Sequence, residues 1–239
     1  MNKRIWELDA LRGLGLLLMI AVHITYDLTE LFGLVRLTHD GLYLFCREWM
    51  GSFFLILSGV CVTLGSHPVK RGLTVFAAGL LITAVTVGMY LLGLADRDVI
   101  IYFGVLHCLG VCMVLWPLLK KLPTWTLPLF GAALIAVGLW LCSSPRGETA
   151  LAVPLGIYPA SFLTSDYFPL LPNLGYFLLG CFVGKTLYAG KTSRLPEKAG
   201  DFFLMRFFRF LGRHSLAVYL LHQPVIYGVI AVISEFTGR

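Results

Sequence analysis

Two ionisable side chains lie one helical turn apart inside the apolar stretch LLMIAVHITYDLTELF. Residues four apart share one face of a helix, so His23 and Asp27 are expected to point the same way. A carboxylate beside an imidazole fixes the tautomer of the ring and raises its basicity, which is the arrangement of a general base. The spacing therefore predicts His23 as a base and Asp27 as the residue that orients it. The alternative is a histidine hydrogen-bonded in the core, with Asp27 in the outer interface.

A second histidine lies in the apolar sequence IIYFGVLHCLGV. If this segment is a membrane helix that runs inward, His107 lies about one-third of the way down and can meet His23 at a similar depth. Gly104, one turn earlier, permits close approach of another helix or a ligand. His107 is therefore a second catalytic candidate, with a structural hydrogen bond across helices as the alternative. His222 lies two residues before Pro224 and is interpreted as part of a helix kink.

The sequence FFLMRFFRFLGRH contains three arginines at intervals of three and four. That spacing places Arg206, Arg209 and Arg213 on one face of a helix that enters the last apolar run. Guanidinium groups bind phosphate oxygens in bidentate fashion, so the cluster predicts a cytoplasmic phosphate site for a nucleotide-bearing cofactor. The alternative is that these side chains anchor the helix to anionic lipid.

Membrane helices must position these residues. Of the 239 residues, 58% are hydrophobic and 13% charged, whereas soluble domains carry about 25% charged residues. Because a run of about 20 apolar residues spans a bilayer as a helix, the sequence predicts an all-α, polytopic membrane helix bundle. The segment 151–163 is broken by prolines and a glycine, which predicts a loop or a partly re-entrant segment. The seven predicted transmembrane helices occupy residues 10–31, 43–64, 72–94, 99–118, 125–142, 169–188 and 211–234.

Lysine and arginine are distributed unevenly between the two sides of this bundle. With the N-terminus inside, fourteen of them fall on inside segments and five on outside segments. Positive residues accumulate on the cytoplasmic side of membrane proteins, so the N-terminus is predicted to be inside and the C-terminus outside. The formal net charge of +6 follows from this asymmetry. It therefore does not indicate nucleic-acid binding.

No internal repeat or low-complexity segment divides the sequence, so residues 1–239 are predicted to form a single transmembrane domain. The six cysteines lie in or beside the apolar runs, without the paired loop motifs of a metal site. Cys108 and Cys112 are one turn apart, but with only His107 beside them this spacing is weak evidence for a metal. We interpret the cysteines as buried thiols and predict no metal site.

Several segments of the chain resemble one protein family. IWELDALRGLGLLLMIAVHITYDL is similar to the opening helix of the heparan-α-glucosaminide N-acetyltransferase catalytic-domain family, in its short bacterial form. FFLILSG, IIYFGVLHCLG, DYFPLLPNLGYFLLG and LGRHSLAVYLLHQPVI resemble its later landmarks, in the same order. Taken together and in this order, these segments are specific to the family, and they span nearly the whole chain. The wider superfamily of transmembrane acyltransferases, which modify cell-surface sugars, shares the opening RG-to-His pattern and the SG of the second helix.

The resemblance implies an enzyme, an acyl-CoA-dependent acyltransferase of the N- or O-acetyltransferase type. Acetyl-CoA would bind from the cytoplasm, and its acyl group would reach an amine or hydroxyl of a sugar or glycan acceptor outside. The resemblance implies His23 as the catalytic residue, although lysosomal relatives place their histidine later, where this chain has only His39. With no large outer domain, the chain is not expected to select heparan sulfate itself. Such a protein would lie in the bacterial inner (plasma) membrane.

Each candidate residue then has an expected role. His23, oriented by Asp27, would deprotonate the acceptor, and His107 or Arg47 would stabilise negative charge on the thioester oxygen. The cofactor-binding residues, for the CoA phosphates, would be Arg12, Arg206, Arg209 and Arg213. The acceptor-binding residues would be Arg47, Asp166 and Tyr167, the last two at the outer rim.

A proton-coupled transporter is the alternative function, with His23, Asp27 and His107 as a relay. Secondary transporters show inverted repeats and paired broken helices, and the sequence contains neither. A membrane protein without catalysis would leave these three polar residues without a role. The expected partners are membrane lipids, a CoA thioester and an extracytoplasmic glycan, with no nucleic acid. Formation of a homo-oligomer is left open.

Overall fold

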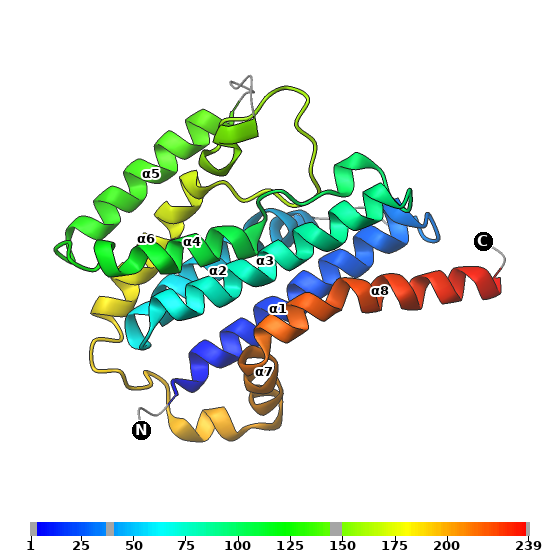
Figure 1. The fold of residues 1–239 in the computed structure, drawn as a ribbon. Helices are drawn as coiled ribbons and strands as arrows, with labels where there is room; N and C mark the ends of the chain where they lie inside the picture. Colours follow the sequence, from blue (N-terminus) through cyan, green and yellow to red (C-terminus); the bar gives the residue numbers. More distant parts are fainter. Residues whose placement is uncertain (1–3, 37–40, 144–149, 238–239) are drawn as a thin grey trace. The chain divides into compact units, whose positions relative to one another are not determined.

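The computed structural model describes residues 4–36, 41–143 and 150–237, and the regular elements assigned in them are all helical (Figure 1). This confirms the all-α prediction for these residues. A π-helical turn, η1 (Asp27–Leu31), extends the first helix, and 3₁₀ segments η2 (Arg97–Val99), η3 (Ala150–Leu155) and η4 (Glu197–Asp201) lie in the connections. The α-helices are α1 (Trp6–Tyr26), α2 (Gly41–Leu64), α3 (Pro68–Leu91), α4 (Val105–Leu119), α5 (Thr126–Cys142), α6 (Leu170–Thr186), α7 (Phe203–Arg213) and α8 (Ser215–Thr237).

Four helical segments among the described residues are long and apolar enough to cross a bilayer. They are Trp6–Leu31, Gly41–Leu64, Pro68–Leu91 and Ser215–Phe236. The apolar helices α4 and α5 have 15 and 17 residues. They are therefore about 23 and 26 Å long, less than the roughly 30 Å of the hydrocarbon core. A helix lies in each of the seven predicted spans, but passage of all seven through a membrane, with the N-terminus inside, stays a prediction.

The last apolar run contains two helices instead of one. α7 ends at Arg213 and α8 begins at Ser215. Between them His214 has φ −103° and ψ 20°, outside the helical region. The prediction that the arginine-bearing helix runs into the last span is therefore wrong, because the backbone leaves the helical conformation at His214.

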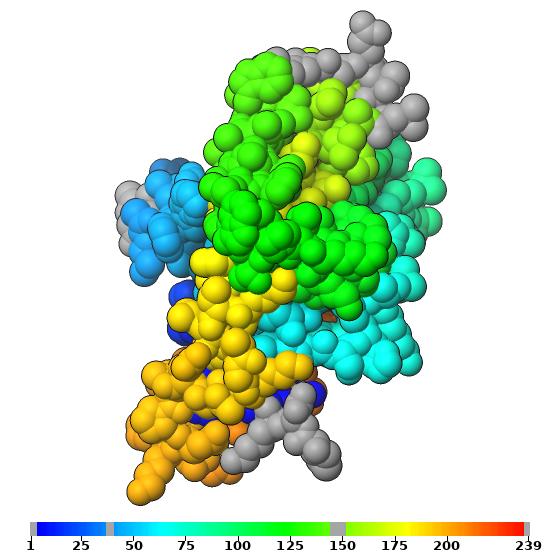
Figure 2. All heavy atoms as spheres, turned by 90° about the vertical axis from the view of Figure 1, so that its left-hand side faces the viewer, coloured from blue at the N-terminus to red at the C-terminus, as the bar shows by residue number. Residues whose placement is uncertain are grey.

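α7 exposes aromatic side chains along one face. Phe203, Phe207 and Phe210 are 81%, 44% and 58% exposed. Its opposite face packs on α1, and a Cβ at Gly212 would overlap the Asp9 carbonyl, so only glycine permits this approach. Figure 2 shows the segment of η4 and α7, in orange, at the surface.

The chain divides into two compact units. Unit 1 contains residues 1–54 and 192–239, and unit 2 contains residues 55–191. α2 contributes its first part to unit 1 and its last part to unit 2. A single domain over residues 1–239 stays a prediction.

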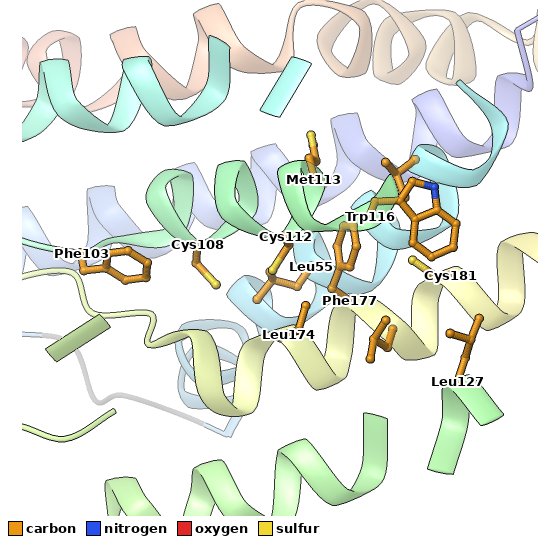
Figure 3. Close-up of a cluster of buried hydrophobic side chains, with 12 residues drawn as sticks. Leu55, Phe103, Cys108, Cys112, Met113, Trp116, Leu127, Leu174, Phe177 and Cys181 are labelled. Atoms are coloured by element: carbon orange, nitrogen blue, oxygen red, sulfur yellow. The ribbon is translucent and has the colours of Figure 1, made fainter. Parts of the chain in front are cut away.

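The core of unit 2 lies where α2, α4 and α6 meet (Figure 3). A Cβ at Gly59 of α2 would overlap the Phe177 carbonyl of α6, and a Cβ at Gly180 would overlap the Ile56 carbonyl. These glycines bring the two backbones into contact, as small residues do between membrane helices. The core side chains are Leu55, Val62, Phe103, Cys108, Cys112, Met113, Trp116, Leu127, Leu174, Phe177, Leu178 and Cys181.

In unit 1, α1 packs against both α7 and α8. The buried carboxylate of Glu7, in the first turn of α1, accepts hydrogen bonds from Ser193 Oγ and from the Arg194 amide, both at 2.7 Å. Those bonds fasten the start of α1 to the segment that leads into η4. The chain then returns through α7 to α8, which places residues near position 222 beside those near position 23.

Candidate active site

Four polar side chains of unit 1 meet where α1 and η1 pack on α8. We call His23, Asp27, His222 and Gln223 the α1–α8 cluster. Asp27 is only 1% exposed. Its carboxylate accepts two hydrogen bonds from Gln223 Nε2, at 3.1 Å to Oδ1 and 2.9 Å to Oδ2. The amide must turn its NH₂ group to the carboxylate, because ionised carboxylate oxygens only accept hydrogen bonds.

The backbone changes its hydrogen-bond pattern at this cluster. α1 is regular as far as Tyr26, so His23 and Asp27 are one turn apart as predicted. From Asp27 onward the bonding becomes i→i+5, and the Phe32 amide donates to the Asp27 carbonyl at 2.9 Å. Single π-helical turns of this kind are frequent at functional sites.

The two histidines of the cluster contact each other. Their ring centroids are 4.8 Å apart and their planes are inclined by 65°. His222 Nδ1 bonds the Tyr219 carbonyl. Since a carbonyl only accepts, Nδ1 carries the proton, and the neutral ring keeps a lone pair on Nε2. That Nε2 atom is buried and has no hydrogen-bond partner among the described residues.

The sequence alone identified two of the four residues of this cluster, His23 and Asp27. Gln223 was missed and His222 was interpreted as a kink residue, although adjacent His and Gln in an apolar run both require polar partners. In the part of the chain that the structure describes, the hydrogen bonds of the Asp27 carboxylate come from Gln223 and none joins it to His23. The role of Asp27 as the residue that orients His23 stays a prediction.

His107 lies in unit 2, in the first turn of α4. Its Nδ1 accepts the Gly104 amide at 3.2 Å, so Nε2 carries the proton in the neutral ring. Nε2 lies 3.3 Å from Thr83 Oγ1, which in turn donates to the Ile101 carbonyl at 2.6 Å. Both ring nitrogens are therefore engaged, as in the structural alternative. Since α4 begins at Val105, His107 is near the end of a helix instead of one-third of the way down.

Asp166 lies beside the same helix end. Its Oδ2 accepts the Val105 amide at 3.1 Å, and a Cβ at position 104 would overlap that carboxyl oxygen in its present position. An acceptor at a helix N-terminus satisfies a free amide and meets the positive end of the helix dipole. Burial raises the pKa of Asp166 to about 6, although the hydrogen bond from Val105 opposes this.

Tyr167, next to Asp166, belongs to a group of aromatic rings. Its hydroxyl donates to the Val153 carbonyl at 2.7 Å. Its ring centroid lies 5.7 Å from that of Tyr158 and 5.2 Å from that of Phe162. Burial raises the pKa of the Tyr167 hydroxyl. Two of the three predicted acceptor-binding residues, Asp166 and Tyr167, therefore lie with His107 in unit 2, whereas Arg47 belongs to unit 1.

Two of the predicted cofactor-binding arginines, Arg12 and Arg213, meet at the start of α1 in unit 1. Arg12 Nη1 lies 3.5 Å from Asp9 Oδ1 and from the Gly212 carbonyl. Arg213 Nε lies 3.5 Å from the other oxygen of Asp9. Asp9 is 8% exposed, so one buried carboxylate holds two guanidinium groups from different helices.

Two further arginines of this set lie on α7. Arg209 Nη1 donates to the Gly200 carbonyl at 2.7 Å and lies 3.7 Å from Asp201. Arg206 is exposed. Arg47, on α2, is also exposed. His39 lies outside the described residues.

A family profile described as "Heparan-alpha-glucosaminide N-acetyltransferase, catalytic" matches residues 4–224. The chain belongs to this family. The match covers both units and includes every member of the α1–α8 cluster. No curated protein and no solved structure matched the chain significantly.

Membership of the heparan-alpha-glucosaminide N-acetyltransferase catalytic family makes the chain a transferase of the acetyltransferase type. The match does not support the transporter alternative. Four long apolar helices fit an integral membrane protein. Within this family assignment, the structure brings His23 and Asp27 into one cluster with His222 and Gln223, and it groups Arg12 with Arg213.

Proposed function

We propose that the protein transfers an acetyl group from cytoplasmic acetyl-CoA to an amine or hydroxyl of a sugar on the outer side of the membrane. The observation that carries this proposal is the α1–α8 cluster, in which a buried Asp27 meets three half-buried polar side chains between apolar helices, in a chain of an acetyltransferase family. Ionisable side chains inside a membrane are costly and mark functional sites.

The base in this reaction is His23. It removes the proton of the acceptor amine or hydroxyl while that atom attacks the thioester carbonyl. α1 is continuous from Trp6, and His23 lies eleven residues beyond Arg12, about 17 Å along the helix axis. A base at this distance from the cytoplasmic end acts on an acceptor that enters from the other side.

The donor side uses the arginines at the start of α1 and on α7. Acetyl-CoA supplies the acetyl group, and its phosphates fit the guanidinium groups of Arg12, Arg206, Arg209 and Arg213. Asp9 supports this assignment, because its carboxylate holds the guanidinium groups of Arg12 and Arg213 close together at the start of α1.

The acceptor side is assigned to residues that the sequence predicts toward the outer surface. Arg47, Asp166 and Tyr167 bind the sugar, and His107 or Arg47 stabilises the negative charge that forms on the thioester oxygen. The aromatic rings around Tyr167 offer a face against which a sugar ring packs. The proposed location is the bacterial inner membrane.

An acetylation assay tests this function. The purified full chain in lipid nanodiscs is incubated with radiolabelled acetyl-CoA and a panel of amino sugars, with His23→Ala as the key variant. We expect label in a sugar product with the wild-type protein and loss of transfer with His23→Ala. Acetyl-CoA affinity of the variant should stay within about twofold, because His23 acts on the acceptor.

Two outcomes would contradict the proposal. If the wild-type chain transfers no label to any amine or hydroxyl acceptor, the activity is wrong. If a folded His23→Ala protein transfers acetyl groups at the wild-type rate, the activity stands but the base is another residue. His67→Ala, which changes a histidine in the connection between α2 and α3, controls for nonspecific effects of losing an imidazole.

A further inference from the structure

We infer that His222 is a second histidine of the proton path: it accepts at Nε2 the proton that His23 takes from the acceptor, and Asp27 stabilises the resulting imidazolium. This inference rests on the proposed function. It concerns a residue that the sequence pattern alone assigns to a helix kink.

The first step of the argument is the tautomer of His222. The Tyr219 carbonyl fixes the proton on Nδ1. Nε2 therefore has a free lone pair, and it is buried without a hydrogen-bond partner among the described residues. A buried acceptor without a donor is unfavourable, and this lone pair is available to accept a proton during the reaction.

The second step is the distance between the rings. Their centroids are 4.8 Å apart, with the planes inclined by 65°. The nitrogens lie on the rims of the rings, so rotation about the side-chain bonds of His23 brings one of its nitrogens within hydrogen-bonding reach of His222 Nε2. His23 has two ring nitrogens and can face the acceptor with one and His222 with the other.

The third step is the negative charge of Asp27, which lies in the same cluster as His222. The carboxylate of the cluster belongs to Asp27, which is buried. Gln223, the neighbour of His222 on α8, holds both carboxylate oxygens. Asp27 is thus placed to stabilise a positive charge on His222. A cation formed there is paired, whereas an isolated cation in a buried site is strongly unfavourable.

These steps give a balanced reaction. The acceptor nitrogen or oxygen forms a bond to the acetyl carbon, and the bond from that carbon to the CoA sulfur breaks. The acceptor proton moves to one nitrogen of His23, and the proton on its other nitrogen moves to His222 Nε2. The same path in reverse returns a proton to the CoA thiolate, so both histidines end neutral.

Two variants of His222 test the inference in the acetylation assay with the full chain in nanodiscs. His222→Gln keeps a polar side chain that cannot gain a proton. We expect its kcat to fall about 10²–10⁴-fold, as for loss of general-base catalysis, with KM for acetyl-CoA within about twofold. In His222→Ala, added imidazole should restore part of the rate, because it can occupy the vacated space and accept the proton.

His214→Gln is the matched control. His214 also bonds a carbonyl through Nδ1, that of Phe210, but it is exposed and outside the cluster. We expect wild-type kcat for this variant.

Three outcomes overturn the inference. His222→Gln could retain a kcat within about threefold of wild type. Both His222 variants could lose activity without any rescue by imidazole, which indicates a packing role. His222→Gln could raise KM for acetyl-CoA while kcat stays unchanged. Failure of the proposed function is distinguishable from these results, because then the wild-type protein itself transfers no acetyl group.

Discussion

The Asp27 carboxylate receives both of its side-chain hydrogen bonds from the Gln223 amide. We predict that Gln223→Leu destabilises the protein by about 1.5–3 kcal/mol, since a buried charged group then loses its donors. In an Asp27→Leu background the same change should cost much less. A double-mutant cycle of unfolding free energies in detergent measures the difference. Equal effects of Gln223→Leu in both backgrounds would show that the two side chains are not coupled.

Asp166 makes the stability of unit 2 depend on pH. Burial raises its pKa from an ordinary value of 3.8 to about 6. Between these values the folded protein binds more protons than the unfolded chain, so stability falls as pH rises from about 4 to about 6 and changes little above. Asp166→Asn should flatten this part of the profile, because its amide oxygen still accepts the Val105 amide. Thermal midpoints measured between pH 4 and 8 provide the test.

The control for this experiment is Asp98→Asn, in an exposed carboxylate of the neighbouring loop. That variant should retain the pH dependence of the wild-type protein. If Asp166→Asn also retains it, another group titrates in this range and the assignment is wrong.

At the residue scale, the spacing of polar residues along one helix was predictable from the sequence, whereas their hydrogen-bond partners on other helices were not. The i, i+4 relation of His23 and Asp27 follows from helix geometry alone, and α1 has that geometry. The bond from Gln223 to Asp27 joins residues 196 positions apart. Such a pair depends on how α8 packs against α1, which local periodicity does not encode.

At the scale of elements, the arginines of α7 have two candidate roles: they bind the phosphates of CoA, or they anchor the helix to anionic lipid. If they bind CoA phosphates, Arg206→Gln should weaken CoA binding about tenfold or more, since a charge-assisted contact contributes roughly 1.5–3 kcal/mol. Binding of pantetheine, which lacks the nucleotide, should not change. Isothermal titration of both ligands against the full chain measures this. Arg206 is exposed and is the cleanest choice among the arginines of α7, because Arg209 and Arg213 also contact acidic groups.

Lys198→Gln on η4 removes an exposed positive charge from the same basic segment and should leave CoA affinity unchanged. Equal losses for CoA and pantetheine in Arg206→Gln, or no loss for either, would assign the arginine to lipid anchoring.

The positions of the helices were predictable from the sequence because each helix coincides with an apolar run. The residues at which the helices begin and end were harder to predict. The fourth span was predicted from residue 99, but α4 begins at Val105. The residues before it bond to other parts of unit 2: the Ile101 amide to Thr86 and the Ile100 carbonyl to Thr164. Thr86 and Thr164 are 15 and 64 positions away from these partners. Such tertiary bonds replace helical ones without any change in hydropathy.

For the whole molecule, the uneven distribution of lysine and arginine predicts orientation. A reporter enzyme fused after Arg239 should be active only on the outer side, and one inserted near Lys191 only on the inner side. Paired reporters that require opposite compartments measure this in living cells. The reverse pattern would exclude an inner N-terminus and, with it, the proposed direction of transfer.

The buried thiols allow the opening rate of each unit to be measured separately. Cys46 is the single cysteine of unit 1, at 5% exposure, and the other five lie in unit 2, where Cys108, Cys112 and Cys181 are fully enclosed. A small thiol reagent reaches enclosed sulfur atoms only when the surrounding helices separate. Mass spectrometry of labelled peptides would thus record two independent opening rates from the unmodified sequence. A ligand that slows labelling of Cys46 alone would thereby reveal which unit it holds closed.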